Sequence, residues 1–295
     1  MLDRYWYGDV ERISPEAAVP IVKISHSEER PGGAANVARN AAALGARVTL
    51  LSVVGRDDAG RRLATLLREE NVTARLHRDA GIATTIKLRV IGRRQQLLRV
   101  DFETVPGHEI LRSKLAEYAR LVMHHDVIVL SDYGKGGLAH IARMIALARR
   151  YRKPVLVDPK GGDFSRYRGA TLITPNRTEF CSVAGEWRSE RELTQRAQRL
   201  RRKLGVEALL VTRSEEGMTL YGGDGRLHVP ARAREVYDVS GAGDTVIATL
   251  AVMLAAGAGL PDAVKVANRA AGIVVGKFGT AVVQAHELFG GGAES

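Results

Sequence analysis

A glycine-rich turn that ends in a carboxylate is the strongest chemical signal in this 295-residue sequence. It reads Asp238-Val-Ser-Gly-Ala-Gly-Asp244-Thr, and the almost wholly apolar run Val246 to Ala256 follows it. Such a turn at the start of a buried helix gathers backbone N–H groups and the positive helix end at one point, which favours an anion. A carboxylate beside a bound anion costs electrostatic energy, so Asp244 needs a task that justifies its place there. The natural task is to take a proton from a hydroxyl that attacks a bound phosphoryl group. Taken alone, the same residue could instead complement the helix dipole.

A second glycine cluster lies near the start of the chain. It reads Pro31-Gly-Gly-Ala-Ala-Asn36 and opens a run of small residues. Paired glycines allow close approach of a backbone, and the Asn36 amide offers both a donor and an acceptor to a polyol. Tight helix packing explains the same residues, and the cluster alone does not decide between the two interpretations.

The elements that must position these residues follow an alternating pattern. Short apolar runs alternate with amphipathic stretches, which is typical of βαβ units. The predicted strands are Val48 to Val53, Val127 to Leu130, Val155 to Val157, Leu172 to Thr174 and Ala208 to Thr212. The predicted helices are Ala34 to Leu44, Gly60 to Glu70, Ser113 to Val122, Leu138 to Tyr151, Glu190 to Leu204 and Ala242 to Ala256. The fold class is therefore α/β, a doubly wound and mostly parallel sheet flanked by helices, with ligands at the carboxyl ends of its strands.

Two segments, about 10–25 and 84–104, break this pattern. In the second, apolar and polar residues alternate on both sides of a Gly92-Arg93-Arg94 turn, which predicts a β-hairpin with one apolar face. A hairpin cannot bury such a face by itself. We therefore expect a small β-strand lid inserted into a single domain of residues 1–295, which covers the site and pairs with a second copy in a homodimer.

Composition argues against several classes of protein. The net charge is +11 and 35 of the 44 basic residues are arginine, but they are spread along the helices and aromatic residues make up only 5%. We therefore expect no nucleic-acid partner. No segment approaches 18 uninterrupted apolar residues, so we expect no membrane partner, and the start lacks the apolar core of a signal peptide, so we expect a cytoplasmic protein. The lone Cys181 is predicted to be a small buried hydrophobe without a redox role.

Four motifs together resemble the ribokinase-like (PfkB) family of sugar kinases. Gly32-Gly-Ala-Ala-Asn36 and Asp238-Val-Ser-Gly-Ala-Gly-Asp244 resemble its two signatures in order and separation. Thr174-Pro-Asn176-Arg-Thr-Glu179 is similar to its Asn-x-x-Glu element, and Val211-Thr-Arg-Ser-Glu-Glu-Gly217 is similar to its nucleotide-binding strand and turn. The resemblance implies a ribokinase-like fold and an ATP-dependent carbohydrate kinase that uses ATP and Mg²⁺.

Five further motifs resemble the D-glycero-D-manno-heptose 7-phosphate kinases within that family. They are Asp3-Arg-Tyr-Trp-Tyr-Gly, Arg12-Ile-Ser-Pro-Glu-Ala, Leu98-Arg-Val-Asp-Phe-Glu103, Ser131-Asp-Tyr-Gly-Lys-Gly136 and Asp158-Pro-Lys-Gly-Gly-Asp-Phe164. This resemblance implies phosphorylation of the anomeric hydroxyl of the heptose phosphate to the 1,7-bisphosphate, on the route to ADP-heptose and lipopolysaccharide. In some bacteria such kinases are fused to an adenylyltransferase, whose His-x-x-His signature is absent here. We therefore expect a stand-alone kinase.

The resemblance also implies roles for individual residues. Asp244 would be the general base, and the backbone N–H groups of Gly241, Ala242 and Gly243 would hold the transferring γ-phosphoryl group. Asn176 and Glu179 would position Mg²⁺ through water. The predicted nucleotide-binding residues are Thr212, Ser214, Gly217, Asn268 and Asn176. The predicted substrate-binding residues are Asp3, Gly32, Gly33 and Asn36 for the sugar hydroxyls, with Arg99, Lys135 and Lys160 as candidate cations for the substrate's own phosphate.

The chain departs from the family pattern at its start. Members usually begin with an apolar strand just before the Asp3 motif, whereas Met1 opens directly on that motif. We therefore expect the first core strand to be missing, through a misassigned start or a natural truncation, which would leave unpaired backbone and an apolar slot in the sheet. Two other functions stay open: a ribokinase-like kinase for another sugar or sugar phosphate, and a catalytically silent regulator that binds a sugar phosphate. The intact Asp244 argues against the regulator.

Overall fold

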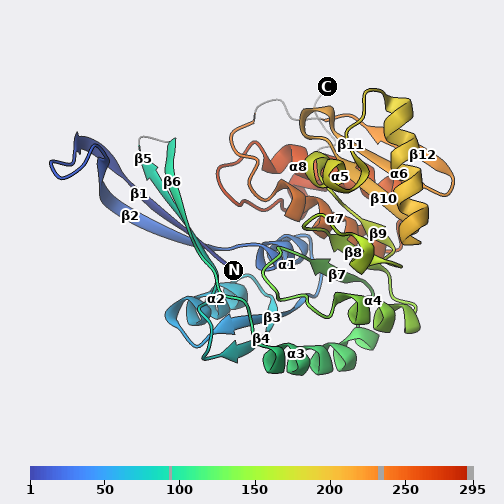
Figure 1. Cartoon of the computed structure of the whole chain (residues 1–295), viewed down its shortest axis with the longest axis horizontal. Coiled ribbons are helices and arrows are strands. Elements are labelled where there is room, and N and C mark those ends of the chain that lie inside the picture. Colours follow the sequence, from blue (N-terminus) through green and yellow to red (C-terminus); the bar gives the residue numbers. More distant parts are fainter. Residues whose placement is uncertain (93–94, 232–235, 291–295) are drawn as a thin grey trace.

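The main sheet of the computed structural model has the strand order β12-β11-β10-β9-β8-β7 (Figure 1). The structure describes residues 1–92, 95–231 and 236–290. The parallel strands are β7 (Ile128–Ser131), β8 (Val155–Asp158), β9 (Leu172–Ile173) and β10 (Ala208–Thr212). The antiparallel strands β11 (Met218–Gly222) and β12 (Gly225–Val229) extend the sheet. The four parallel strands lie where the sequence predicts strands, and the α/β class is confirmed.

Helices cover both faces of this sheet. On one face lie α3 (His108–Leu121), α4 (Ile141–Arg150) and α6 (Glu190–Leu204), and on the other lie α1 (Ala34–Ala43), α7 (Ala242–Ala255) and α8 (Leu260–Val274). Successive strand residues point to opposite faces. In β8, Val155 and Val157 therefore join the first core while Leu156 joins the second. Burial of both faces explains why these strands are continuous apolar runs.

Three further helices and three 3₁₀ turns are described. They are α2 (Asp58–Glu69), α5 (Arg177–Ala184) and α9 (Ala285–Phe289), with 3₁₀ turns η1 (Val122–His124), η2 (Ser165–Tyr167) and η3 (Ser214–Glu216). Cys181 lies on α5 and is partly exposed, so the prediction of a buried cysteine is wrong. Within the described residues, no helix is both long and apolar enough to cross a lipid bilayer.

A four-stranded sheet of order β2-β1-β5-β6 projects from this body (Figure 1). Its strands are β1 (Leu2–Ile13), β2 (Pro20–Pro31), β5 (Ile86–Gly92) and β6 (Gln95–Phe102). β5 and β6 pair antiparallel as the hairpin pattern predicts, and the predicted turn at Arg93 and Arg94 lies outside the described residues. The first two strands are longer than the predicted 10–25 segment, because they also include Asp3 and the residues up to Pro31. We call this sheet the lid.

The remaining strands form a separate sheet. β3 (Thr49–Gly55) pairs in parallel with β4 (Thr73–Asp79), a strand that the sequence analysis does not predict. Within the described residues, the other edge of β3 and the outer edge of β7 have no strand partner. A cavity of about 200 Å³ lies between them, lined by Leu51, Val127 and Val129 among others. We call this cavity the inter-sheet slot.

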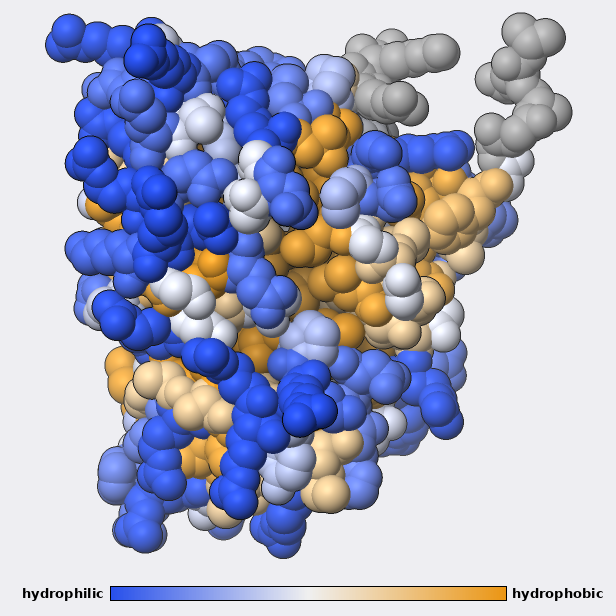
Figure 2. Space-filling view, turned by 90° about the vertical axis from the view of Figure 1, so that its right-hand side faces the viewer, coloured by the Kyte–Doolittle hydropathy of each residue, from blue (hydrophilic) through white to orange (hydrophobic). Residues whose placement is uncertain are grey.

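Charge and hydropathy are distributed unevenly over the surface. Figure 2 shows hydrophilic side chains over much of one face, with an apolar area in its middle. The helix α6 carries many of the arginines, and its apolar residues Leu193, Ala197 and Leu204 are buried in the core. Such a helix has a solvated polar face and one packed face. The arginines of α6 are thus explained by solvation.

Candidate active site

Asp244 lies in the first turn of α7 and is only 7% exposed. The N-cap residue of this helix is Gly241, whose φ of 80° is the left-handed conformation that glycine adopts at little cost. A Cβ on Gly241 would also lie 2.8 Å from the Asn36 Nδ2 atom. The first N–H groups of a helix have no acceptor within the helix, and they carry its positive dipole end. The turn of Gly241, Ala242 and Gly243 therefore presents a donor-rich end of α7 beside a carboxylate.

Two hydrogen bonds fix the Asp244 carboxylate. The Tyr133 hydroxyl donates to Oδ1 over 2.5 Å, and Asn36 Nδ2 donates to Oδ2 over 2.8 Å. Burial raises the Asp244 pKa to about 6, Asp3 adds to the rise, and the two hydrogen bonds together with Lys87 oppose it. A carboxylate with such a pKa is largely ionised at neutral pH and is a strong enough base to accept a proton from a hydroxyl.

A cavity of about 220 Å³ opens beside Asp244 at the carboxyl ends of the parallel strands. It contains several residues that the sequence analysis selected, namely Asn176, Glu179, Thr212, Gly241, Gly243 and Lys160. They come from α5, β10, the start of α7 and the segment after β8. These residues converge at the carboxyl edge of the sheet, which is where a doubly wound fold is expected to bind its ligand.

Asp158, at the end of β8, lines the same cavity. Burial and the nearby Asp244 and Glu179 carboxylates raise the Asp158 pKa well above its usual range, while Lys160 opposes the rise. Carboxyl side chains outnumber the ammonium group of Lys160 in the lining of the cavity, and a polyphosphate would need accompanying cations to enter it.

Asn176 and Glu179 form a capping box at the start of α5. The Glu179 N–H donates to Asn176 Oδ1 over 2.9 Å, the Asn176 N–H donates to Glu179 Oε2 over 3.1 Å, and Lys160 Nζ lies 2.9 Å from Glu179 Oε1. These oxygens already have partners, and within 1–92, 95–231 and 236–290 no group of three or more His, Cys, Asp or Glu is arranged to hold a metal. The pair fits a divalent ion that keeps its water shell, and it does not form a direct metal cage.

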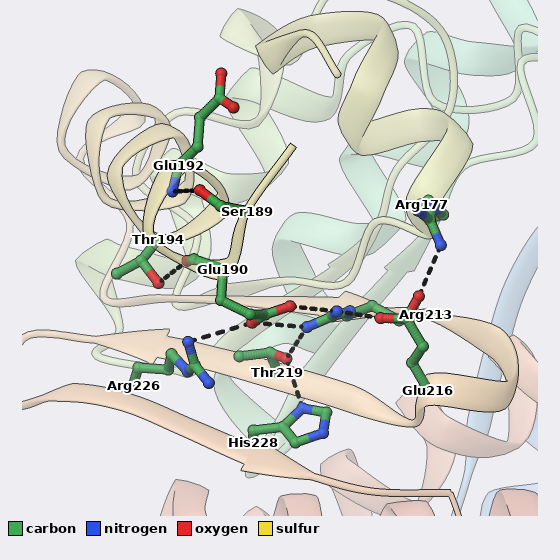
Figure 3. Close-up of polar contacts among 10 residues, drawn as sticks. All are labelled: Arg177, Ser189, Glu190, Glu192, Thr194, Arg213, Glu216, Thr219, Arg226 and His228. Carbon is green, nitrogen blue, oxygen red and sulfur yellow. Dashed lines mark hydrogen bonds and ion pairs between the residues drawn. The ribbon is translucent and has the colours of Figure 1, made fainter. Parts of the chain in front are cut away.

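The predicted nucleotide turn is anchored by Arg213, which the sequence analysis did not select. Arg213 is 5% exposed, and Figure 3 shows its guanidinium between Glu190 and Glu216. It also donates to Thr219 Oγ1 over 3.3 Å. The guanidinium thereby connects β10, α6 and β11 directly behind the turn. A planar guanidinium suits such multiple contacts because its donors form a rigid fork.

The turn itself has an unusual backbone. Ser214 has φ 53° and Gly217 has φ 85°, and a Cβ on Gly217 would collide with the Val229 carbonyl oxygen. Thr212 lines the Asp244 cavity and bridges to Asn176. Asn268 lies on α8, where its Nδ2 donates to the Pro230 carbonyl over 2.8 Å. Among these residues, only Thr212 and Asn176 line the Asp244 cavity.

The predicted sugar residues gather on the other side of Asp244. Asp3 is buried and its Oδ1 accepts from Arg89 Nη1 over 2.9 Å. A Cβ on Gly32 would collide with the Asp3 carboxylate, and a Cβ on Gly33, whose φ is 58°, would collide with Met1. Two glycines are therefore required where the lid strand β1 approaches α1. The contact of Arg89 with Asp3 was not predicted from the sequence.

The three candidate cations lie in different places, each against a carboxylate. Lys160 pairs with Glu179 in the Asp244 cavity. Lys135 pairs with Glu103 and lines a neighbouring cavity of about 110 Å³, together with Met1, Ser52 and Tyr133. Arg99 pairs with Asp101 on the lid strand β6 at 3.0 Å. The structure therefore does not bring these three side chains to one point.

Comparison with known proteins assigns this fold and its cavity to the carbohydrate kinases. The sequence matches the pfkB family of carbohydrate kinases over residues 2–286, and the chain belongs to that family. Two solved structures share the fold: phosphofructokinase-2 from Escherichia coli (TM-score 0.81, 20% identity, 97% of this chain and 93% of that one) and ribokinase from Arabidopsis thaliana (TM-score 0.77, 18% identity, 98% and 95%).

More similar sequences are known among characterised proteins. The chain is 59% identical over 290 residues to a D-beta-D-heptose 7-phosphate kinase from Bordetella bronchiseptica, with 98% of this chain and 93% of that protein covered. It is 55% identical over 289 residues to the bifunctional protein HldE from Alcanivorax borkumensis, again over 98% of this chain. The chain spans 61% of the length of that bifunctional protein.

Proposed function

We propose that this kinase transfers the γ-phosphoryl group of ATP to the anomeric hydroxyl of D-glycero-D-manno-heptose 7-phosphate, in the cytoplasm, on the route to ADP-heptose. The observation that carries the proposal is the buried Asp244 at the positive end of α7, in a chain 59% identical to a heptose 7-phosphate kinase. The motifs that resemble those of heptose 7-phosphate kinases lie between Asp3 and Phe164, and they include parts of the lid strands and one part of the cavity lining, with Tyr133, Asp158 and Lys160.

The residues around Asp244 fit in-line phosphoryl transfer. The carboxylate accepts the proton of the attacking hydroxyl while the amides of Gly241, Ala242 and Gly243 stabilise charge on the equatorial oxygens. Bound Mg²⁺ supplies further neutralisation of the nucleotide phosphates, and Asn176 and Glu179 would hold its water shell. Thr212, Ser214 and Gly217 would contact the nucleotide, with Asn268 near its base or ribose.

The sugar hydroxyls would bind Asp3, Asn36 and the backbone at Gly32 and Gly33. Lys135 is the favoured cation for the 7-phosphate, because it lines a neighbouring cavity that shares Tyr133 with the Asp244 cavity but does not include Asn176. Lys160 shares the cavity with Asn176 and Glu179, where it suits the transferring phosphoryl group. Arg99 would join the 7-phosphate only through closure of the lid.

The lid would also form the contact of a homodimer. Its strands carry exposed apolar side chains, namely Ile13, Ile24, Leu97, Leu98 and Phe102. Exposed apolar residues that share one sheet are typical of an interaction surface. The outer edges of β2 and β6 have no strand partner within the described residues, so a second copy could continue the sheet.

The test is release of ADP from ATP and Mg²⁺ by the purified chain with D-glycero-D-manno-heptose 7-phosphate, beside fructose 6-phosphate, fructose 1-phosphate, ribose and adenosine. We expect turnover with the heptose phosphate alone and a phosphorus NMR signal for a new anomeric phosphate. Turnover with a different sugar would refute the proposed substrate but leave the proposed phosphoryl-transfer mechanism in place. A folded protein inactive with every acceptor would overturn the proposal in favour of a sugar-phosphate-binding regulator.

A further inference from the structure

Tyr133 lies between two cavities. Its side chain lines the cavity that contains Asn176 and Thr212, and also the neighbouring cavity that contains Lys135. The ring fits against Gly33, where a Cβ would lie 3.1 Å from the ring edge. Tyr133, together with Asp132, therefore lies where the cavity proposed for the nucleotide adjoins the cavity proposed for the sugar phosphate.

Both oxygens of Asp244 are occupied by protein donors, Tyr133 on Oδ1 and Asn36 on Oδ2. A general base must accept a hydrogen bond from the hydroxyl that it deprotonates. A carboxylate oxygen can accept more than one hydrogen bond, but Asp244 is only 7% exposed, so the acceptor hydroxyl of the sugar competes with one of the two donors for its position on the carboxylate.

Asn36 is held in place from several directions. It is fully buried on α1, and Asn40 Nδ2 donates to its backbone carbonyl over 2.9 Å and to its Oδ1 over 3.3 Å. Tyr133 instead belongs to the loop after β7, followed by Gly134 and Gly136 with φ of 68° and 76°. The phenol also presents to Oδ1 the same O–H donor that a sugar would present. Tyr133 is thus the donor that can move.

We propose that Tyr133 occupies the position of the acceptor hydroxyl on Asp244 until the sugar phosphate displaces it, and that it thereby keeps water away from the base while ATP alone is bound. The inference rests on the proposed kinase function. Tyr133 acts through Asp244, so it is a positioning residue.

The reaction that Tyr133 would suppress is hydrolysis of ATP. In that reaction a water oxygen forms the new bond to the γ-phosphorus, the bond from this phosphorus to the β,γ-bridging oxygen breaks, and the water proton passes to the Asp244 carboxylate. ADP and inorganic phosphate leave. Burial and Asp244 raise the Tyr133 pKa well above its usual value, so the phenol stays protonated and remains a donor.

The experiment compares Tyr133→Phe with the wild-type chain. The variant keeps the ring against Gly33 but frees Asp244 Oδ1. We expect ATP hydrolysis without sugar to rise by about tenfold and the KM for heptose 7-phosphate to fall by about tenfold, a factor equal to ~1.4 kcal/mol, while the KM for ATP stays constant. Tyr118→Phe is the matched control, because it removes one buried phenol hydrogen bond, to the Met144 carbonyl, away from Asp244.

Unchanged hydrolysis and unchanged sugar KM in Tyr133→Phe would overturn the inference, and so would a parallel fall in all constants with a lowered melting temperature. The proposed function fails in a different way. If the wild-type chain does not phosphorylate heptose 7-phosphate, that function is refuted. The rates of ATP hydrolysis by the wild-type chain and by Tyr133→Phe still decide whether Tyr133 excludes water. Calorimetric titration of heptose 7-phosphate without nucleotide adds a second measure, in which the variant should bind more tightly.

Discussion

Replacement of Asp244 by Asn should separate the activity of the site from its stability. Asp244 is buried, and its folded pKa of about 6 lies above the usual value of 3.8. The folded chain thus binds this proton more tightly than the unfolded chain does. The linked contribution stabilises the fold below pH 4 and is lost as the pH rises through 6.

The magnitude follows from the size of this difference. A rise of roughly 2 pKa units corresponds to about 3 kcal/mol between the two protonation states. The neutral amide of the Asp244→Asn variant avoids that cost at neutral pH. It has a single acceptor oxygen for the two donors Tyr133 and Asn36, however, and the lost hydrogen bond destabilises the variant by about 1 kcal/mol. We expect a net gain of about 2 kcal/mol at pH 7.5, together with a loss of about 10² to 10⁴ in kcat from removal of the base.

Urea unfolding at pH 7.5 and at pH 5, with ADP release measured on the same samples, checks both effects. The stability difference between Asp244→Asn and wild type should shrink as the pH falls through 6. Asp224→Asn, in the exposed turn between β11 and β12, is the control and should change neither quantity. The reasoning is refuted if Asp244→Asn is less stable than wild type at pH 7.5, or if it keeps most of its kcat.

Four further changes test other parts of the structure. Arg213→Met should raise the KM for ATP and lower the melting temperature, because it releases the turn at Ser214 and removes the guanidinium that Glu190 and Glu216 share, whereas the sugar KM should not change. Gly32→Ala should raise the sugar KM alone, since the new Cβ displaces the Asp3 carboxylate. Val100→Ser with Phe102→Ser should convert a dimer to a monomer in analytical ultracentrifugation, and an unchanged mass would rule out the lid as the interface. An apolar β-forming segment fused before Met1 should raise the melting temperature by filling the inter-sheet slot, which a Gly-Ser segment of equal length should not do.

Much of the core could be predicted because its strands are buried on both faces. Val155, Leu156 and Val157 form an uninterrupted apolar run since they alternate between two cores. The glycine turn before α7 likewise marked the start of the helix that holds Asp244, because the left-handed conformation of Gly241 favours glycine there. Local chemistry was therefore sufficient to place Asp244 at the start of α7 and at the edge of the sheet where the cavity lies.

Contacts that depend on distant packing could not be predicted. Tyr133 lies in a motif that the sequence analysis quoted, yet its bond to Asp244 joins residues 111 positions apart. β4 was missed because its residues, Thr73 to Asp79, mix charged and apolar types on a half-exposed strand. In both cases the determining partner lies elsewhere in the chain, and periodicity within a short window does not identify it.

The cation that binds the substrate phosphate could not be predicted from the sequence either. A lysine in a motif indicates an anion nearby, but each of Lys135, Lys160 and Arg99 meets a carboxylate of the protein itself. A substrate phosphate would therefore compete with Glu103, Glu179 or Asp101 for the cation. The net affinity for the phosphate is the difference between the free energy of the new pair, cation with phosphate, and that of the old pair, cation with protein carboxylate. The phosphate therefore binds best at the lysine whose carboxylate partner is most easily solvated. Glu103 directly follows the lid strand β6, so entry of the 7-phosphate at Lys135 would be coupled to movement of the lid.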